Sequence, residues 1–342
     1  MDKPLISFVV WCHNQESFIR EAVESAFAQS YSPLEIIISD DCSTDRSFSI
    51  VKEMVAAYKG PHVVHLNRND KQLGMGGHVN RTMSLSHGEL VVAAAGDDVS
   101  LPHRTQTIYE AWEQSGRRAT SVFSSYTIIA ADGAIRGVGG ERDGADSSKP
   151  CQMLNGNLLE FLLRRTPVVN GCSHAWSPVL FSYFGPLQSD LEDLVLSFRS
   201  LAIGAMLYIH EPLMKYRRHG ANASFLAEGE TITFDRREWR LRLVDEQNVK
   251  AYDNMLSDIE VLRAEGRISS AERDRLAQEA RLLRERNALE RKMMDGNMLQ
   301  RAVTLADAIR RGYVRCALRA SPRLLPRSIY RALYVSLRDC QP

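Results

Sequence analysis

Short apolar runs alternate with amphipathic stretches through the first 131 residues of the chain. Strand-like runs, rich in β-branched residues, occupy 5–11, 34–39, 62–66, 89–95 and 120–130. Between them, apolar residues at helical spacing predict helices at about 16–29, 45–58, 76–86 and 102–115. Strands that alternate with helices build a mainly parallel sheet. The pattern therefore predicts an α/β fold, Rossmann-like, with helices on both faces of the sheet.

The pattern is less regular from 132 to 228. Residues 132–152 are rich in glycine and polar side chains and predict a long loop, and loops of that length are usually functional or mobile. We expect the rest to contain helices near 154–165 and 188–201, an irregular stretch at 166–177, and strands at 206–209 and 213–214. Residues 1–131 and 132–228 are predicted to be two halves of one domain, 1–228.

A charged, proline-free segment follows at 232–292 and predicts a helical hairpin within a region spanning 229–298. Ser269 and Glu272 form a capping-box pattern for its second helix. The first helix carries an apolar stripe of Trp239, Leu243, Tyr252, Met255, Ile259 and Leu262. Such stripes are packing surfaces. This one can pack on the preceding domain or on a second copy of the chain, which makes 232–292 a candidate homo-oligomer interface.

The last 44 residues, 299–342, carry most of the charge imbalance. They hold nine arginines but only Asp307 and Asp339 as acids, a net charge of +7, whereas the rest of the chain sums to −6. The arginines mix with apolar residues at helical spacing, and a basic amphipathic segment of this kind binds anionic membranes. A helix packed on its own domain is the alternative, and the sequence leaves both readings open.

Composition excludes several classes of protein. The 342 residues are 44% hydrophobic and 25% charged, as in soluble globular proteins, and no apolar stretch approaches the roughly 20 residues that span a bilayer. The six cysteines are scattered without a CxxC pair, which favours reduced thiols. With no evident signal peptide, we expect a cytoplasmic protein, peripheral on the inner face of the cytoplasmic membrane, with no nucleic-acid partner.

Acidic pairs follow two of the predicted strands. Asp40 and Asp41 end the second run, and Asp97 and Asp98 follow the fourth. Ligands of open α/β sheets lie beyond the carboxyl ends of the strands, where such carboxylates can hold a hard divalent cation and, through it, a phosphate. No glycine-rich phosphate loop is present, because residues 74–79 fail the GxGxxG pattern at its last position. The sequence thus indicates a metal–nucleotide site built from carboxylates.

Several short motifs run in order from residue 4 to about 225. They are 6–14, 22–31, 35–45, 73–74 with Asn80, 87–89, 95–98 with Pro102, 192–193, and 216–219 with Asn222 and Ser224. Their order and spacing resemble the family 2 glycosyltransferases, inverting enzymes of the GT-A fold that use nucleotide-diphosphate sugars. The resemblance implies that 1–131 is the nucleotide-binding half and 132–228 the acceptor half. Residues from 232 onward lie outside it.

The resemblance implies a nucleotide and metal site. Asp41 would contact the base, and His13 would lie against it where many relatives have tyrosine; Asn14 and Asp97 complete the nucleotide set. Asp97 and Asp98 occupy the so-called DXD site, but Ala95 and Gly96 precede them, so the first acid is missing. Asp98 and His219 are the implied ligands of Mg²⁺ or Mn²⁺. The alternative for each aspartate is a turn or a helix cap.

The resemblance also implies a general base, Asp193, at the start of a helix whose N-terminus favours the ionised form. Asp190 is the second candidate for the general base, and Glu192 lies beside Asp193. Arg217 and Arg218 would add positive charge near the phosphates, unless they belong to an ordinary basic strand. His174 and Trp176 lie on the implied acceptor side, although a buried core position is the commoner fate of tryptophan.

Together these features predict an inverting glycosyltransferase that moves one sugar from a nucleotide-diphosphate sugar to a hydroxyl of a glycan or lipid-linked acceptor. The predicted setting is polysaccharide or lipid-linked glycan assembly. The alternative is a non-catalytic nucleotide-sugar-binding or scaffold protein that uses the helical hairpin to join partners. A processive synthase would need transmembrane spans, and a nicotinamide-dependent epimerase would need a glycine fingerprint near the first strand.

Overall fold

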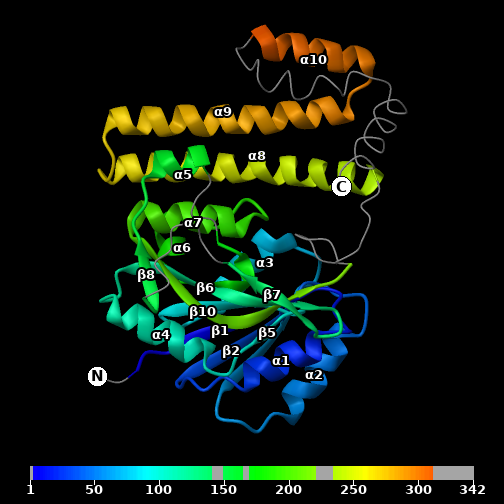
Figure 1. The fold of residues 1–342 in the computed structure, drawn as a ribbon, viewed down its shortest axis with the longest axis vertical. Coiled ribbons are helices and arrows are strands. Elements are labelled where there is room, and N and C mark those ends of the chain that lie inside the picture. Colours follow the sequence, from blue (N-terminus) through cyan, green and yellow to red (C-terminus); the bar gives the residue numbers. More distant parts are fainter. Residues whose placement is uncertain (1–2, 141–148, 165–168, 221–233, 311–342) are drawn as a thin grey trace. The chain divides into compact units, whose positions relative to one another are not determined.

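The computed structural model describes residues 3–140, 149–164, 169–220 and 234–310, with side chains of the last range described from 241. The chain forms two compact units, Met1–Glu228 and Gly229–Pro342. Each is described here by itself. Figure 1 shows the first as a sheet with helices and the second as a set of helices.

A mixed sheet of ten strands forms the first unit, within the part of the chain that the structure describes. Eight strands run in the order β3-β2-β1-β4-β9-β6-β10-β5, while β7 pairs with β6 and β8 with β10. The strands are β1 Ile6–Cys12, β2 Leu34–Asp40, β3 Val63–Arg68, β4 Leu90–Ala95, β5 Val99–Ser100, β6 Ala119–Ala130, β7 Ile135–Gly139, β8 Cys151–Leu154, β9 His174–Trp176 and β10 Ala205–Arg218.

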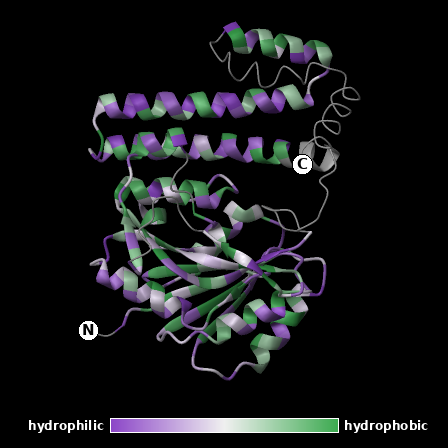
Figure 2. Ribbon diagram, viewed as in Figure 1, coloured by the Kyte–Doolittle hydropathy of each residue, from purple (hydrophilic) through white to green (hydrophobic). Residues whose placement is uncertain are grey.

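The predicted mostly parallel α/β architecture is confirmed. β1 pairs in parallel with β2 and β4, β2 with β3, and β6 with β10. All seven residues of β1 and of β2 are buried, which explains why these strands read as continuous apolar runs. Figure 2 shows the central strands largely in the hydrophobic colour, whereas much of α8 and α9 is hydrophilic.

Helices cover both faces of this sheet (Figure 1). They are α1 Ile19–Phe27, α2 Ser47–Ala57, α3 Gly74–Met83, α4 Arg104–Gln114, α5 Leu158–Arg164, α6 Val179–Phe184 and α7 Glu192–Ile203, with a 3-10 turn η1 Gly171–Ser173. Phe8 and Val10 of β1 pack in one core with residues of α1, α2 and α4. Trp11 projects to the opposite face, where its indole N–H donates to Thr82 Oγ1 of α3 at 3.0 Å.

The loop predicted at 132–152 is wrong in part. β7 pairs antiparallel with β6, and β8 pairs antiparallel with β10. The residues of β7 are mostly exposed and include two glycines, and those of β8 are only half-buried, so neither strand leaves a buried apolar signature. Residues 141–148 lie outside the described residues.

Two further irregularities of the sequence have a structural cause. The stretch predicted as irregular at 166–177 holds β9, a three-residue strand inserted antiparallel between β4 and β6. The strands predicted at 206–209 and 213–214 are one strand, β10, whose register with β6 shifts on both sides of Pro212. Proline has no N–H to give to the ladder, so it marks an irregularity and not an end.

The second unit contains α8 Phe234–Ala264, α9 Ser270–Asp295 and α10 Met298–Arg310. Gly266 has a φ of 71° in the turn between α8 and α9, and Ser269 Oγ accepts from Glu272 N at 3.2 Å. The stripe residues Tyr252, Met255, Ile259 and Leu262 are buried, whereas Leu243 is 45% exposed; the side chain of Trp239 lies outside the described residues. No described helix is long and apolar enough to cross a membrane.

Candidate active site

Three neighbouring strands deliver the predicted nucleotide residues to one edge of the sheet. β1 lies between β2 and β4, with Cys12 opposite Asp40 and Trp11 opposite Ala95. His13, Asp41 and Asp97 each follow within two residues of a strand end. The register therefore brings together the residues that the sequence placed at separate strand ends.

His13 and Asn14 shape the turns at this edge. The Nδ1 of His13 lies 2.8 Å from the backbone oxygen of Asp41, and the ring is partly exposed. Asn14 and Cys42 have φ values of 52° and 60°, a left-handed conformation that asparagine tolerates. The Oδ1 of Asn14 accepts from Thr44 N at 2.8 Å. Asn14 thus holds the loop after β2, and the His13 ring lies next to this loop.

Asp41 holds the start of α3. Its Oδ1 accepts from Asn69 Nδ2 at 2.8 Å and from Leu73 N at 2.9 Å, and its Oδ2 accepts from Gly74 N at 3.1 Å. Gly74 has a φ of 75°, which favours glycine at that turn. These bonds use three of the roughly four acceptor positions of a carboxylate. One position is left for a donor on a ligand.

Asp97 and His219 form a close pair. The Oδ2 of Asp97 lies 2.9 Å from Nε2 of His219, although the two residues are separated by 122 positions in the sequence. The His219 ring packs on Phe18, with ring centroids 4.7 Å apart. The end of β4, the end of β10 and the approach to α1 therefore meet at this pair.

Asp98 has a different environment from its neighbour. Its Oδ1 accepts from the backbone N of Arg217 at 2.8 Å, and its Oδ2 has no hydrogen-bond partner among the described residues. Burial, and then the charge of Asp97, raise the pKa of Asp98 well above its ordinary value. Through the bond from Arg217 N, the Asp98 carboxyl group ties β10 to the end of β4. Asp97 is the member of the pair that lies beside His219.

Of the two arginines predicted near the phosphates, Arg217 is bonded to other residues of the fold and Arg218 is partly buried. Arg217 is 3% exposed. Its Nε donates to the Asp97 backbone oxygen at 2.9 Å and its Nη1 to the Ala131 oxygen at 3.0 Å, and its guanidinium forms an ion pair with Glu21. Arg218 is partly buried. Arg217 thus braces β10 against the turn after β4, and its charge is shared with Glu21.

The candidate general bases lie next to the same helix that Asp41 holds. Asp190 Oδ1 accepts from Gly76 N of α3 at 2.9 Å. Three residues later Asp193 lies in the first turn of α7, where its Oδ1 accepts from Leu194 N at 2.7 Å. The first turn of α3 is therefore bonded to Asp41 on one side and to Asp190 on the other. This places the segment 190–193 beside the nucleotide residues.

Glu192 is the acid adjacent to Asp193. Burial, and then the charge of Asp193, raise the pKa of Glu192 well above its ordinary value. Its Oε1 lies 2.3 Å from the position that a Cβ on Gly171 would take, so a larger residue at 171 would require this carboxyl group to move. A neutral Glu192 lets Asp193 carry the negative charge of the pair.

His174 and Trp176 are core residues. Their exposed fractions are 0% and 1%. Trp176 stacks on Trp11 with ring centroids 6.0 Å apart. Neither ring nitrogen of His174 has a partner among the described residues, and burial lowers the pKa of His174 to about 3. In this structure neither side chain reaches the surface, so the acceptor contact expected for them finds no support.

Sequence reasoning missed the residues that support the site from outside its motifs. Asn69, Phe18 and Gly171 contact Asp41, His219 and Glu192 respectively. Asn69 follows the end of β3, so the rule that pointed to Asp41 could have found it. Phe18 and Gly171 carry no such signal, because their contacts depend on residues 201 and 21 positions away.

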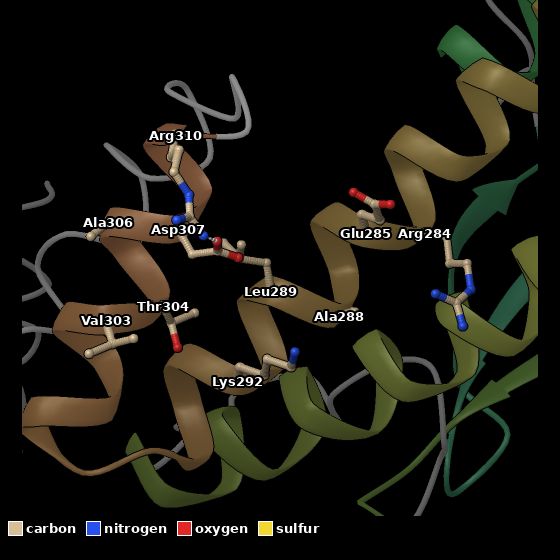
Figure 3. A pocket seen from close by; sticks show the side chains of 10 residues that line it. All are labelled: Arg284, Glu285, Ala288, Leu289, Lys292, Val303, Thr304, Ala306, Asp307 and Arg310. Carbon is tan, nitrogen blue, oxygen red and sulfur yellow. Dashed lines mark hydrogen bonds and ion pairs between the residues drawn. The ribbon is translucent and has the colours of Figure 1, made fainter.

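No three metal-ligating side chains gather in one place within the ranges that the structure describes. A hollow of about 640 Å³ lies between α9 and α10 (Figure 3), but it is lined by residues of the second unit and includes none of the predicted site residues. A metal at the Asp97–His219 pair would thus need ligands besides the described His, Cys, Asp and Glu side chains.

Comparison with known proteins points to one family. Residues 7–135 match the model of the family described as Glycosyl transferase family 2. Over these residues the chain is similar to glycosyltransferase family 2. The family match runs from β1 to β6. It includes His13, Asp41, Asp97 and Asp98, which follow the ends of β1, β2 and β4.

The relatives that the chain resembles are distant. An uncharacterized glycosyltransferase of Rickettsia typhi is 24% identical over 230 residues, 65% of this chain and 66% of that protein. One of Rickettsia felis is 25% identical, over 65% of this chain and 35% of that protein. The putative glycosyltransferase EpsE of Bacillus subtilis is 32% identical over 103 residues, 30% of this chain and 36% of that protein. The matches thus span at most about two thirds of these relatives.

A solved structure confirms the GT-A fold. The crystal structure of Staphylococcus aureus TarS 1–349 in complex with UDP superposes with a TM-score of 0.50. The match covers 98% of this chain and 92% of TarS 1–349 at 14% sequence identity.

Proposed function

We propose that the protein is an inverting glycosyltransferase that moves one sugar from a nucleotide-diphosphate sugar to a hydroxyl of a glycan or lipid-linked acceptor. The observation that carries the proposal is the convergence of three groups on one edge of the sheet. Asp41, the Asp97–His219 pair and the start of α7 are linked through the first turn of α3 and the ends of β1, β2 and β4. The same edge thus holds candidate residues for binding the nucleotide, for neutralising the charge of the diphosphate and for removing the proton of the acceptor.

The nucleotide would bind at Asp41 and His13. Asp41 keeps one acceptor position, which suits an N–H of a nucleobase, and the partly exposed His13 ring offers a flat face for stacking. TarS, which shares the fold, was crystallised with UDP. On that basis we propose a nucleotide-diphosphate sugar as donor, with UDP-sugars as the first to test.

The Asp97–His219 pair fits a divalent cation. Asp97 Oδ2 and His219 Nε2, which lie 2.9 Å apart, would both hold the ion in place of the hydrogen bond between them. Carboxylate oxygen suits Mg²⁺ and Mn²⁺, with diphosphate oxygens and water as the remaining ligands. We assign the metal to Asp97 and His219, with Asp98 as the support behind them. When bound, the ion would stabilise the charge on the departing diphosphate.

Asp193 would act as the general base. It takes the proton of the acceptor hydroxyl while the hydroxyl oxygen bonds to C1 of the sugar. The bond from C1 to the diphosphate breaks on the opposite face, its electron pair stays with the diphosphate, and the anomeric centre inverts. The positive end of α7 favours the ionised form of Asp193, and the raised pKa of Glu192 favours a neutral neighbour. Asp190, whose Oδ1 accepts from Gly76 N, is the second candidate.

Asp193→Asn tests this assignment. The variant should lose at least about 1,000-fold in kcat and keep its donor dissociation constant within about threefold, because the base acts on the acceptor and not on the nucleotide. Donors are found first by thermal shift with UDP-, dTDP- and GDP-sugars, with and without Mn²⁺. An equal loss of donor binding and turnover would remove Asp193 from the base role.

A non-catalytic donor-binding scaffold is the second candidate, favoured by the missing first acid of the DXD site at Ala95. Donor binding without turnover on any acceptor would support it. In either case we propose that 229–298 contributes packing or self-association, which size-exclusion chromatography with light scattering would measure. The proposed setting is the cytoplasmic side of glycan assembly.

A further inference from the structure

We propose that Asn80 of α3 is a positioning residue that holds the general base in place through Leu187. The inference rests on the proposed role of Asp193, and it gives a role to an asparagine that no step of the proposed reaction uses. Asn80 Nδ2 donates to the Leu187 backbone oxygen at 2.8 Å, and the Leu187 N–H donates to Asn80 Oδ1 at 2.8 Å. One side chain thus pairs with both backbone groups of a residue 107 positions away.

The same face of α3 is attached to this stretch of chain at a second point. Gly76 lies one turn before Asn80, and its N–H donates to Asp190 Oδ1 at 2.9 Å. A Cβ on Gly76 would lie 2.2 Å from the Ser189 backbone oxygen, so the stretch packs directly on the backbone of α3. Residues 187–190 are therefore held at their first residue by Asn80 and at their last by contact with Gly76.

The start of α7 follows directly from this stretch. The N-cap residue of α7 is Leu191, which makes no side-chain capping hydrogen bond, whereas a serine or aspartate there would fix the first turn from within the helix. Asp193 follows Asp190 by three positions. A shift of 187–190 would therefore move the base, and a misplacement of about 1 Å can lower a rate about 100-fold.

The opposite end of α7 has a separate anchor, which supplies a matched control. Thr120 Oγ1 of β6 donates to the Ser200 backbone oxygen at 3.0 Å and lies 3.3 Å from the Ala205 backbone oxygen. Thr120 and Asn80 are both partly buried. Each side chain thus bonds to backbone at one end of α7, but only Asn80 bonds at the end that carries Asp193.

Hydrogen exchange of the full-length protein, measured by mass spectrometry, tests the attachment without relying on catalysis. Asn80→Leu and Thr120→Val each replace a polar side chain by an apolar one of similar shape. Asn80→Leu should speed exchange over residues 187–194 at least about fivefold, the equilibrium factor that corresponds to the net contribution of about one hydrogen bond. It should leave exchange over 198–205 unchanged, and Thr120→Val should have the reverse effect.

The kinetics of sugar transfer test whether the attachment acts through Asp193. Asn80→Leu should lower kcat by about 10–100-fold and keep the donor dissociation constant within about threefold of the wild-type value. In the Asp193→Asn background it should lower the residual kcat less than about threefold, because residues that act as one unit are not additive. A loss of folded protein would lower both rates by the same factor. Thr120→Val should keep kcat within about threefold of wild type, since the start of α7 stays in place.

Asn80→Ala removes the same two bonds and is measured in parallel, so that a folding defect in one variant does not decide the result; leucine and alanine are both good helix formers. The proposal is overturned if exchange over 187–194 keeps the wild-type rate in both variants. It is also overturned if Asn80→Leu lowers kcat by the same factor with and without Asp193. A wild-type protein that transfers no sugar to any acceptor would instead refute the proposed function, and the exchange rates would still decide whether Asn80 holds the stretch before α7.

Discussion

The neighbouring acids Asp97 and Asp98 should respond in opposite ways to the same substitution. Asp97→Asn replaces a carboxylate that lies 2.9 Å from His219, so a divalent cation would lose an anionic ligand. Asp98→Asn replaces a buried acid whose pKa is raised by burial by a group of the same shape, and its side-chain oxygen can still accept from Arg217 N. We therefore expect the affinity for the metal to fall strongly in Asp97→Asn and to change little in Asp98→Asn.

The expected magnitudes differ by orders of magnitude. Removing residues that only orient a metal ligand costs 10–100-fold in metal affinity, so loss of a direct anionic ligand should cost at least about 100-fold, or about 2.7 kcal/mol. Asp98→Asn should change Mn²⁺ affinity less than about threefold. Its cost falls on stability, at about 1–3 kcal/mol, because the amide nitrogen takes the position of Oδ2, which has no hydrogen-bond partner among the described residues.

Titration calorimetry of Mn²⁺ into the protein with saturating UDP measures the first quantity, and urea unfolding measures the second. Each variant is compared with the wild type at the same pH. The reasoning is refuted if Asp98→Asn abolishes Mn²⁺ binding while Asp97→Asn retains it.

Three further substitutions test how individual carboxyl groups stabilise the fold. Asp41→Asn should lower the unfolding free energy by about 2–4 kcal/mol in urea, because an amide cannot accept all three bonds from Asn69, Leu73 and Gly74; an unchanged midpoint would contradict the role given to Asp41. Glu192 has a raised pKa, so the stability it contributes is present below its ordinary pKa of 4.5 and is lost as pH rises; Glu192→Gln should flatten that decline in thermal melts from pH 5 upward. Burial alone would raise the pKa of Glu35, but hydrogen bonds from Ser7 and His87 hold it below its ordinary value; its contribution is present above pH 4.5 and is lost on acidification, so Glu35→Gln should destabilise the protein at pH 7 and converge with the wild type in acid.

Much of the site could be predicted from the sequence because it depends on strand ends. Asp41 and Asp97 follow buried parallel strands, and the carboxyl ends of parallel strands share an edge of the sheet. The register of β1 with β2 and β4 then brings them together. The helical hairpin could also be predicted, because its apolar stripe and its capping box are patterns of residues close together in the sequence.

The remaining features depend on contacts that no local pattern records. Asp97 and Asp98 are adjacent, and only β10, about 120 residues later, supplies the Arg217 N–H and the His219 ring that separate their roles. Trp176 belongs to β9, a strand of three residues that is buried only because β4 and β6 flank it. The sequence showed the residue types there but not which face of the sheet would cover them.

The most direct test of the account is the position of the metal in crystals grown with UDP and Mn²⁺. The account predicts an anomalous scattering peak within about 2.0–2.3 Å of a side-chain oxygen of Asp97 and of Nε2 of His219, with UDP phosphate oxygens as further ligands. A nucleotide bound at Asp41 with manganese at Asp98 alone, or with no manganese beside Asp97, would contradict it.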